Sequence, residues 1–192
     1  MSGLDADRFD RLRLIRSPNI GPVAYRQLIR RFGSAAAALD AIPAFAARGG
    51  TRAFRLADEG QVRREAQSVA RLGGRYDLLG DPDYPALLAE AEGGPPVLMA
   101  RGHLDLSART SVAIVGARNA SAAACRFARS LAQDLGAQGS IVVSGLARGI
   151  DTAAHMGSLG SGTVAVMPAV LTSLSRQRKP NFRKGSRRRD CS

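Results

Sequence analysis

The pattern of apolar and polar residues divides the chain into a helical first part and a second part in which strands and helices alternate. In the first part, Leu12, Leu14 and Ile15 predict one apolar side of a helix that stops before Pro18, because proline disfavours a helical conformation in the preceding residue. A tight turn at residues 20–22 precedes a second helix. The apolar residues of that helix, and the glycine that ends it, are Val23, Leu28, Ile29, Phe32 and Gly33.

Two short helices joined by a glycine-containing turn have the outline of a helix-hairpin-helix, in which backbone N–H groups can face a DNA phosphate. An ordinary helical hairpin with a Gly-Pro turn explains the same pattern, because the hairpin is short and contains one glycine. With a further helix over 56–73, either interpretation predicts a small helical domain over residues 1–74. Residues 75–105 predict a short strand, a turn, a short helix and a second strand, which together form a bridging segment.

The pattern changes at residue 111. "SVAIVG" and "SIVVSG" are short apolar runs that end in glycine, as expected of strands buried on both faces of a sheet. Between them lies an alanine-rich helix with Ser121 as its N-cap and Phe127, Leu131 and Leu135 as its apolar stripe. A helix in "IDTAAHMGSLG" and a strand in "GTVAVM" follow. This alternation predicts a parallel α/β sheet of Rossmann type, but an incomplete one, over residues 106–167.

The net charge of +12 favours a polyanionic partner, but the charge is unevenly spread. Residues 167–192 hold eight basic groups and one acidic group, so a net +5 remains for residues 1–166. That value is compatible with nucleic-acid binding and does not by itself indicate it. Cys125 and Cys191 form neither a disulfide framework nor a metal-ligand cluster, and no apolar run is long enough for a membrane span. With an N-terminus unlike a signal peptide, we expect a cytoplasmic protein without a metal.

Two loops follow the first two strands of the predicted sheet, at the edge where open parallel sheets bind ligands. Residues 116–121 and 144–151 each combine glycine, one arginine and the start of a helix, a combination that attracts anions. We therefore predict that they form a phosphate-binding rim. The residues predicted to bind there are Gly116, Arg118, Ser121, Ser144, Gly145, Arg148 and Gly149.

Neither loop carries the G-x-G-x-x-G fingerprint of dinucleotide binding or the G-x-x-x-x-G-K-[ST] motif of ATP hydrolysis, so no cofactor is predicted. Asp151 and His155 are spaced to share one helix face. A catalytic pair is one interpretation. The other is a supporting role, in which Asp151 favours the helix dipole and His155 packs locally. The absence of a nucleophile or metal partner beside them favours the supporting role.

Several segments together resemble the DNA processing protein A family, also called DprA or Smf. They are "VAIVGARNAS", "IVVSGLARGIDTAAHMGSL" and "GTVAV", preceded by "DPDYPALLAEAEGGPPVLMARG" and "NIGPVAYRQLIRRFG", and they cover residues 10–167. The resemblance implies a sterile-alpha-motif-like helical domain followed by an extended Rossmann-type domain. It also implies a dimeric protein without catalysis that binds single-stranded DNA and loads the RecA recombinase during natural transformation. The residues that it assigns to the DNA backbone are Gly116, Arg118, Ser144, Gly145, Arg148 and Gly149.

No aromatic residue lies in either loop, so the base stacking common in single-strand binders must come from elsewhere or be absent.

Two other classes of function remain open. A Rossmann-type nucleotide-hydrolysing enzyme of the lysine-decarboxylase-like type shares a related sheet, and a purely structural interaction module is a third class. Replacing Arg118 and Arg148 discriminates among the three classes. The change removes DNA binding from a single-strand binder, removes nucleotide turnover from the hydrolysing enzyme, and affects neither property in a structural module.

The composition changes abruptly after Met167, since both lysines of the chain lie beyond it. Where the family continues with Ala-Gly-Gly-x-Asp, this chain has the basic segment 168–192. Inserting one G after the Met167 codon lets another frame read Ala-Gly-Gly-Leu-Asp, so we interpret the segment as a disordered, out-of-frame tail of a truncated protein. A native nucleic-acid-binding extension is the alternative. Truncation predicts an unpaired strand edge and exposed apolar surface, which can inactivate the product.

Overall fold

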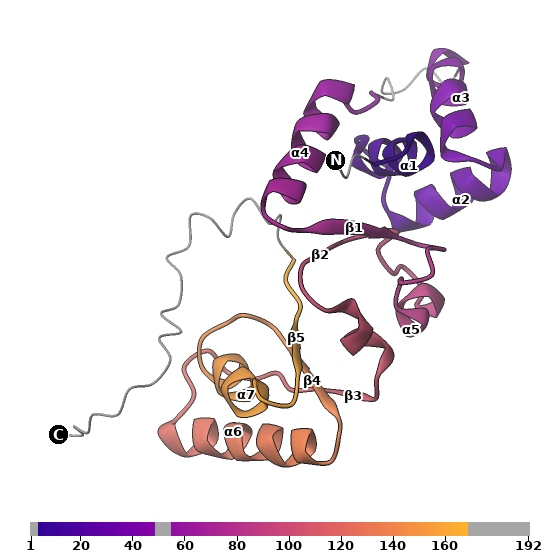
Figure 1. Cartoon of the computed structure of the whole chain (residues 1–192). Helices are drawn as coiled ribbons and strands as arrows, with labels where there is room; N and C mark the ends of the chain where they lie inside the picture. The colour runs from indigo at the N-terminus through magenta and orange to yellow at the C-terminus, as the bar shows by residue number, and fades with distance from the viewer. Residues whose placement is uncertain (1–3, 49–54, 169–192) are drawn as a thin grey trace.

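The computed structural model describes residues 4–48 and 55–168, and the predicted tail over 168–192 falls almost entirely outside these ranges. Figure 1 shows a mostly helical part followed by an α/β part. Among the described residues, no helix combines the length and the apolar character needed to cross a membrane. In chain order the elements are α1 (Ala6–Arg16), α2 (Pro22–Phe32), α3 (Ala35–Arg48), α4 (Glu59–Arg71), β1 (Arg75–Leu78), α5 (Ala86–Glu90), β2 (Val97–Ala100), the 3₁₀ helix η1 (Leu104–Ala108), β3 (Ser111–Ala113), α6 (Ala122–Ala137), β4 (Ile141–Ser144), α7 (Ile150–Ser158) and β5 (Thr163–Ala165).

Residues that favour the ends of helices set the boundaries of the first two helices. The Asp5 carboxylate caps α1 by accepting a hydrogen bond from the Arg8 backbone N–H at 2.9 Å. Proline occupies the first turn of α2, where its missing N–H costs no hydrogen bond. Gly33 ends α2 in the left-handed conformation, with φ of 80°, which glycine adopts without a Cβ penalty. The prediction of two helices around a short turn is confirmed.

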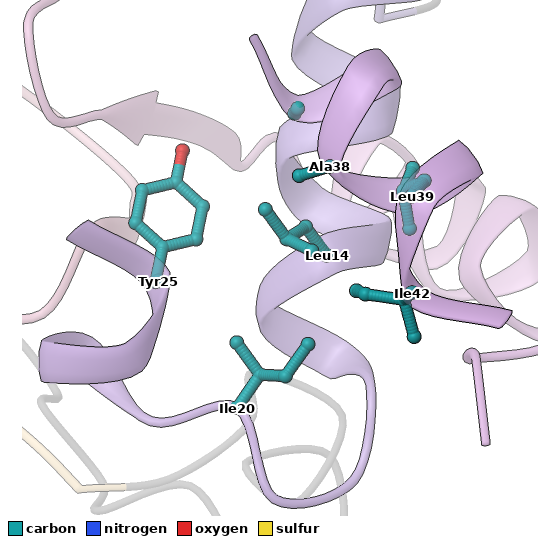
Figure 2. Packing of buried hydrophobic residues seen from close by; sticks show 7 residues of the cluster. Leu14, Ile20, Tyr25, Ala38, Leu39 and Ile42 are labelled. Atoms are coloured by element: carbon teal, nitrogen blue, oxygen red, sulfur yellow. The ribbon is translucent and has the colours of Figure 1, made fainter. Parts of the chain in front are cut away.

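Helix α1 lies between two separate apolar clusters. Leu14 packs into the first cluster with α2 and α3, as Figure 2 shows, whereas Leu12 packs into a second cluster with α4 and β1. Ile15 contacts both. The prediction that Leu12 and Leu14 lie on one side of the helix is therefore wrong, because residues two apart point about 200° apart around a helix. The buried members of the first cluster are Leu14, Ile20, Tyr25, Ala35, Ala38, Leu39 and Ile42.

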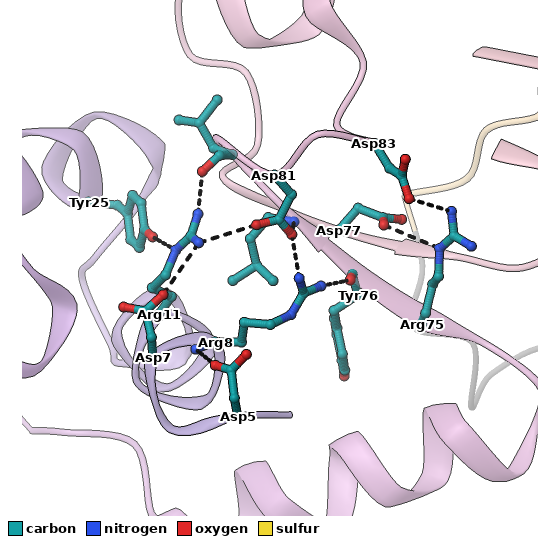
Figure 3. A network of polar contacts seen from close by, with 12 residues as sticks. Asp5, Asp7, Arg8, Arg11, Tyr25, Arg75, Tyr76, Asp77, Asp81 and Asp83 are labelled. Atoms are coloured by element: carbon teal, nitrogen blue, oxygen red, sulfur yellow. Dashed lines mark hydrogen bonds and ion pairs between the residues drawn. The ribbon is translucent and has the colours of Figure 1, made fainter. Parts of the chain in front are cut away.

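Strands β1 and β2 pair antiparallel and belong physically with the helices that precede them. Tyr76 and Leu78 of β1 are buried in the second cluster against α1 and α4. At the end of β1, Asp81 forms ion pairs with Arg8 at 2.9 Å and with Arg11 at 3.4 Å, both from α1 (Figure 3). The domain boundary at residue 74 stays a prediction, and these contacts tie the start of the bridging segment to the helical core.

Strands β3, β4 and β5 form a parallel sheet in that order, so the predicted alternation of strands and helices is confirmed. Ile114, just beyond β3, and Val142 of β4 pack against Ala132 of α6 and Ala154 of α7. Both helices therefore cover the same face of the sheet, as two right-handed crossovers in one direction require (Figure 1).

The other face of this sheet is partly open. The prediction that the first strand is buried on both faces is wrong, because all three residues of β3 are exposed. Side chains alternate between the faces of a sheet, so Val115 and Val166 point away from the two helices, and they are 76% and 59% exposed. Within the described residues, β3 and β5 each pair with β4 alone. Val115 and Val166 leave apolar surface on this face, and the expectation of an incomplete sheet stays a prediction.

Helix α6 packs through small side chains instead of the predicted apolar stripe. Phe127 is 70% exposed and Leu131 is 38% exposed, so the prediction holds only for Leu135, which packs partly against the core. The physical reason lies in α7, because a Cβ on Gly157 would be 2.2 Å from a carbonyl oxygen of α6. Helices this close accept only small residues between them. The buried residues of α6 are Ala128, Ala132 and Gly136.

The exposure of Phe127 leads to a direct prediction. We expect Phe127→Ser to change the free energy of unfolding by less than about 0.5 kcal/mol and to reduce binding of a hydrophobic dye, since the side chain is mostly in solvent. Urea unfolding and dye fluorescence measure the two effects. As a control, Ala132→Leu places bulk in the contact with α7 and should destabilise by about 1–3 kcal/mol. A cost above about 1 kcal/mol for Phe127→Ser would mean that another part of the chain covers Phe127.

Candidate nucleic-acid interface

The two predicted loops lie side by side at the carboxyl edge of the parallel sheet. Loop 116–121 leads from β3 into α6, and loop 144–151 leads from β4 into α7. The Ile150 backbone N–H donates to the Ala117 carbonyl oxygen at 3.3 Å and joins them. The N-terminal ends of α6 and α7 are therefore neighbours, and the unpaired N–H groups and helix dipoles of both favour an anion at the same edge.

The glycines of the loops are explained by the contact between the two loops. At Gly149, φ is 84° and a Cβ would lie 2.3 Å from the Ala117 carbonyl oxygen. At Gly116, a Cβ would lie 2.7 Å from the Ile150 side chain. Any side chain at either position would force the loops apart. Their assignment to direct DNA contact stays a prediction, whereas their role in joining the loops follows from these distances.

The two serines of the rim differ in what they offer to a ligand. The Ser144 side chain is buried, with 3% exposed, and its hydroxyl donates to the Ile114 carbonyl oxygen at 2.6 Å. It therefore holds β4 to the end of β3 and faces away from solvent. Ser121 is exposed and caps α6, because its Oγ accepts the Ala124 backbone N–H at 3.2 Å. The predicted N-cap is confirmed.

The arginines of the rim carry charge that nothing in the described chain neutralises. Arg118 and Arg148 are exposed, and neither side chain forms an ion pair or hydrogen bond with any described residue. Sequence reasoning missed Arg126 and Arg129 of α6, which are also exposed and also lack a partner among the described residues. Their exposed positions on a helix that starts at the rim could have indicated them. By contrast, the arginines of the helical part that pair with carboxylates are Arg8, Arg11, Arg13, Arg16, Arg63 and Arg75.

Asp151 and His155 lie behind the rim. Both are buried, with 7% and 6% exposed. The His155 ring contacts the Gly145 carbonyl oxygen and the Thr163 hydroxyl, which favours the interpretation of local packing over that of a catalytic pair. The role of both residues in supporting the rim stays a prediction. In the ranges that the structure describes, no group of three or more histidine, cysteine or acidic residues is arranged to hold a metal ion.

The chain combines a helix-hairpin-helix unit with a small parallel sheet whose carboxyl edge attracts anions. A family model described as DNA recombination-mediator protein A matches residues 75–188, and one described as DprA-like N-terminal HHH domain matches residues 5–68. The chain belongs to the DNA recombination-mediator protein A family. The first match continues past Met167 and includes much of the segment interpreted as an out-of-frame tail, and that interpretation stays a prediction.

Individual relatives agree with this assignment. DNA processing protein DprA of Streptococcus pneumoniae is 42% identical over 89 residues, which is 45% of this chain and 31% of that protein. Protein Smf of Synechocystis is 42% identical over 93 residues, 45% of this chain and 23% of that protein. The X-ray structure of DprA from Streptococcus pneumoniae has a TM-score of 0.50 and 36% identity, over 57% of this chain and 38% of that one. This chain thus spans less than two fifths of each relative.

Proposed function

We propose that this chain takes part in DNA processing during natural transformation and binds the backbone of single-stranded DNA at the rim of loops 116–121 and 144–151. Membership of the recombination-mediator family supports a DNA-processing role. The observation that carries the proposal is the pair of exposed and unpaired arginines, Arg118 and Arg148, at the starts of two adjacent helices. A guanidinium group and a helix N-terminus each favour a phosphate, and here two of each meet at one edge.

The same geometry explains how such binding would be independent of base sequence. The rim offers charge and backbone N–H groups, which recognise phosphates and not base edges. Binding of this kind weakens as salt rises, because each neutralised phosphate releases counterions. Arg126 and Arg129 extend the positive surface along α6, away from the two loops. A strand that follows this surface would therefore contact at least the four unpaired arginines.

For the complete family fold, the proposal extends to loading of a RecA-type recombinase onto the bound strand, to a homodimer, and to a cytoplasmic protein that is not an enzyme. The Thr163 hydroxyl beside His155 is bonded to the Val142 carbonyl oxygen, which supports a role without catalysis. The competing class, a nucleotide-hydrolysing Rossmann enzyme, would use the same two arginines to hold a nucleotide phosphate.

The test is the affinity for a fluorescent oligothymidylate, measured by anisotropy at several salt concentrations. We expect the double variant Arg118→Ala/Arg148→Ala to bind about a hundredfold more weakly, at about 1.4 kcal/mol for each lost charge-assisted contact. Its salt slope should fall by about 1.4, or about 0.7 for each phosphate contact. The control is Arg64→Ala, which removes one charge on α4 from an exposed arginine whose side chain pairs with no described residue.

The outcomes separate the classes of function. A loss of about tenfold for Arg64→Ala, which is half of the double variant's loss in free energy for half of the charge, would mean that binding depends on net charge and not on the rim. An unchanged affinity of the double variant contradicts the proposal. Turnover of a nucleoside monophosphate by the unmodified chain, lost in the double variant, would favour the enzyme.

A further inference from the structure

We propose that Phe127 of α6 stacks on a base of the strand whose phosphates bind at the rim. The inference rests on the proposed function of the rim and names a contact that the rim itself lacks, since loops 116–121 and 144–151 contain no aromatic residue. Bases are open to a protein ring in a single strand, whereas in a duplex they are paired and stacked on one another. The contact therefore favours single-stranded DNA.

Phe127 offers an aromatic ring to solvent. It is 70% exposed, and it is the one exposed aromatic residue among those whose side chains the structure describes. The others are buried or partly buried, and they are Phe9, Tyr25, Phe32, Tyr76 and Tyr84. An exposed ring contributes little to folding, because it removes little apolar surface from water. It can stack on any base, since every base has a π-face.

Helix α6 brings Phe127 close to the rim. The helix begins at the rim with its N-cap Ser121, and Phe127 lies five positions after Ala122, the first residue of the helix. At 1.5 Å per residue, Ala122 and Phe127 are about 7.5 Å apart along the helix axis. Figure 1 shows α6 at the outside of the α/β part, so a strand that leaves the rim can follow this helix.

The outer face of α6 carries charge on one side and the aromatic ring on the other. Consecutive residues point about 100° apart around a helix, so Arg126 and Phe127 lie on two sides of this face. Ala123 and Ser130 are each three or four positions from both residues and therefore lie between them. Both are small and exposed. Arg129, three positions after Arg126, extends the charged side.

This arrangement matches the two ends of a nucleotide. The side chains of Arg126 and Arg129 form no ion pair or hydrogen bond with a described residue, so their charge is open to phosphates. A nucleotide whose phosphate binds on that side can extend its base across the small residues to Phe127. Asp134, one turn after Ser130, repels phosphate and ends the surface. Complementary charge and continuity with the rim identify the bound strand as the occupant.

The first experiment compares oligothymidylate with an oligomer of the same length and charge in which every nucleotide is abasic. Both offer the same phosphates, so the difference in affinity measures the contribution of the bases. We expect the unmodified chain to bind oligothymidylate about tenfold more tightly, as for the stacking of one base. Phe127→Ser should bind both oligomers equally, with the salt slope unchanged. Equal affinities for the unmodified chain, or a preference that survives in Phe127→Ser, overturn the inference.

Further variants separate stacking from other roles of the side chain. Phe127→Tyr should keep the preference for oligothymidylate, whereas Phe127→Leu, which is apolar but has no ring, should lose most of it. The matched control is Leu87→Ser on α5, which removes a side chain that is 85% exposed and should leave the preference unchanged. If Phe127→Ser converts a dimer to a monomer, measured by light scattering, and keeps the preference, the ring contacts a second copy and the inference is wrong.

Tryptophan fluorescence gives a direct measurement, because the chain contains no tryptophan. Phe127→Trp places a single indole at the proposed contact, where oligothymidylate should quench it and the abasic oligomer should not. Leu87→Trp is the control and should not be quenched by either. Binding of oligothymidylate without quenching of Phe127→Trp overturns the inference alone. Absence of binding of either oligomer, measured by anisotropy, contradicts the proposed function of the rim instead, so the two failures are distinguishable.

Discussion

Replacing Gly149 with alanine is expected to abolish binding of single-stranded DNA at the rim and to lower the free energy of unfolding by about 3–5 kcal/mol. Two costs add at this position. Its φ of 84° and ψ of −128° belong to a region that residues with a Cβ avoid. The new Cβ would also lie 2.3 Å from the Ala117 carbonyl oxygen and 2.8 Å from that of Arg118. Both atoms belong to the backbone, so no side-chain rotation relieves the contact.

The chain offers a close control in Gly139. Its φ is 85°, and a Cβ there would meet no atom within 4 Å. Gly139→Ala therefore carries the conformational cost alone, about 1 kcal/mol, and should bind oligothymidylate like the unmodified chain. Urea unfolding followed by circular dichroism, with anisotropy measured where each variant is folded, separates loss of binding from loss of structure. Similar behaviour of the two variants would contradict the role of Gly149 in joining the loops.

Gly149 also illustrates what the sequence could predict of the site. A glycine and an arginine between a buried strand and a helix correctly indicated a loop at the carboxyl edge of a parallel sheet. The sequence could not show that the glycine is required by loop 116–121, because that contact joins residues about thirty positions apart. Ser144 is a similar case. Its place at the end of a strand led to its assignment to the phosphate-binding rim, whereas its hydroxyl points towards the Ile114 carbonyl oxygen.

Helices were predicted correctly where the pattern within one helix decides the structure, and less well where a neighbour decides it. The N-cap Ser121 and the extent of α6 follow from local preferences. Which side of α6 is buried depends on Gly157 of α7, so the large apolar Phe127 stays in solvent while Ala132 is buried. In the same way, α1 has two buried sides because β1 returns to pack against it, and the local periodicity of α1 contains no sign of that strand.

The contact between α1 and the end of β1 gives the second large effect. We expect Asp81→Asn to lower the free energy of unfolding of the helical part by about 2–4 kcal/mol, measured by urea unfolding. The Asp81 side chain is 12% exposed, accepts the Leu78 backbone N–H at 2.8 Å, and pairs with Arg8 and Arg11. Arg11 also donates to the hydroxyl of Tyr25 at 3.3 Å, and burial raises the pKa of Tyr25, so that hydroxyl stays neutral and cannot replace the lost carboxylate.

The nearby Asp83 is the matched control for this prediction. It pairs with Arg75 at 3.4 Å, but its side chain is 69% exposed, so Asp83→Asn should cost less than about 1 kcal/mol. Asparagine at position 81 keeps an oxygen for the Leu78 N–H and removes only the charge, so the difference between the two variants measures the loss of the carboxylate charge beside two partly buried guanidinium groups. Arg11 keeps its longer ion pair with Asp7 at 3.6 Å. Equal and small effects would mean that water replaces the Asp81 carboxylate. A large effect for Asp81→Asn alone would mean that β1 and α1 fold as one unit, with residues 75–81 as part of the helical domain.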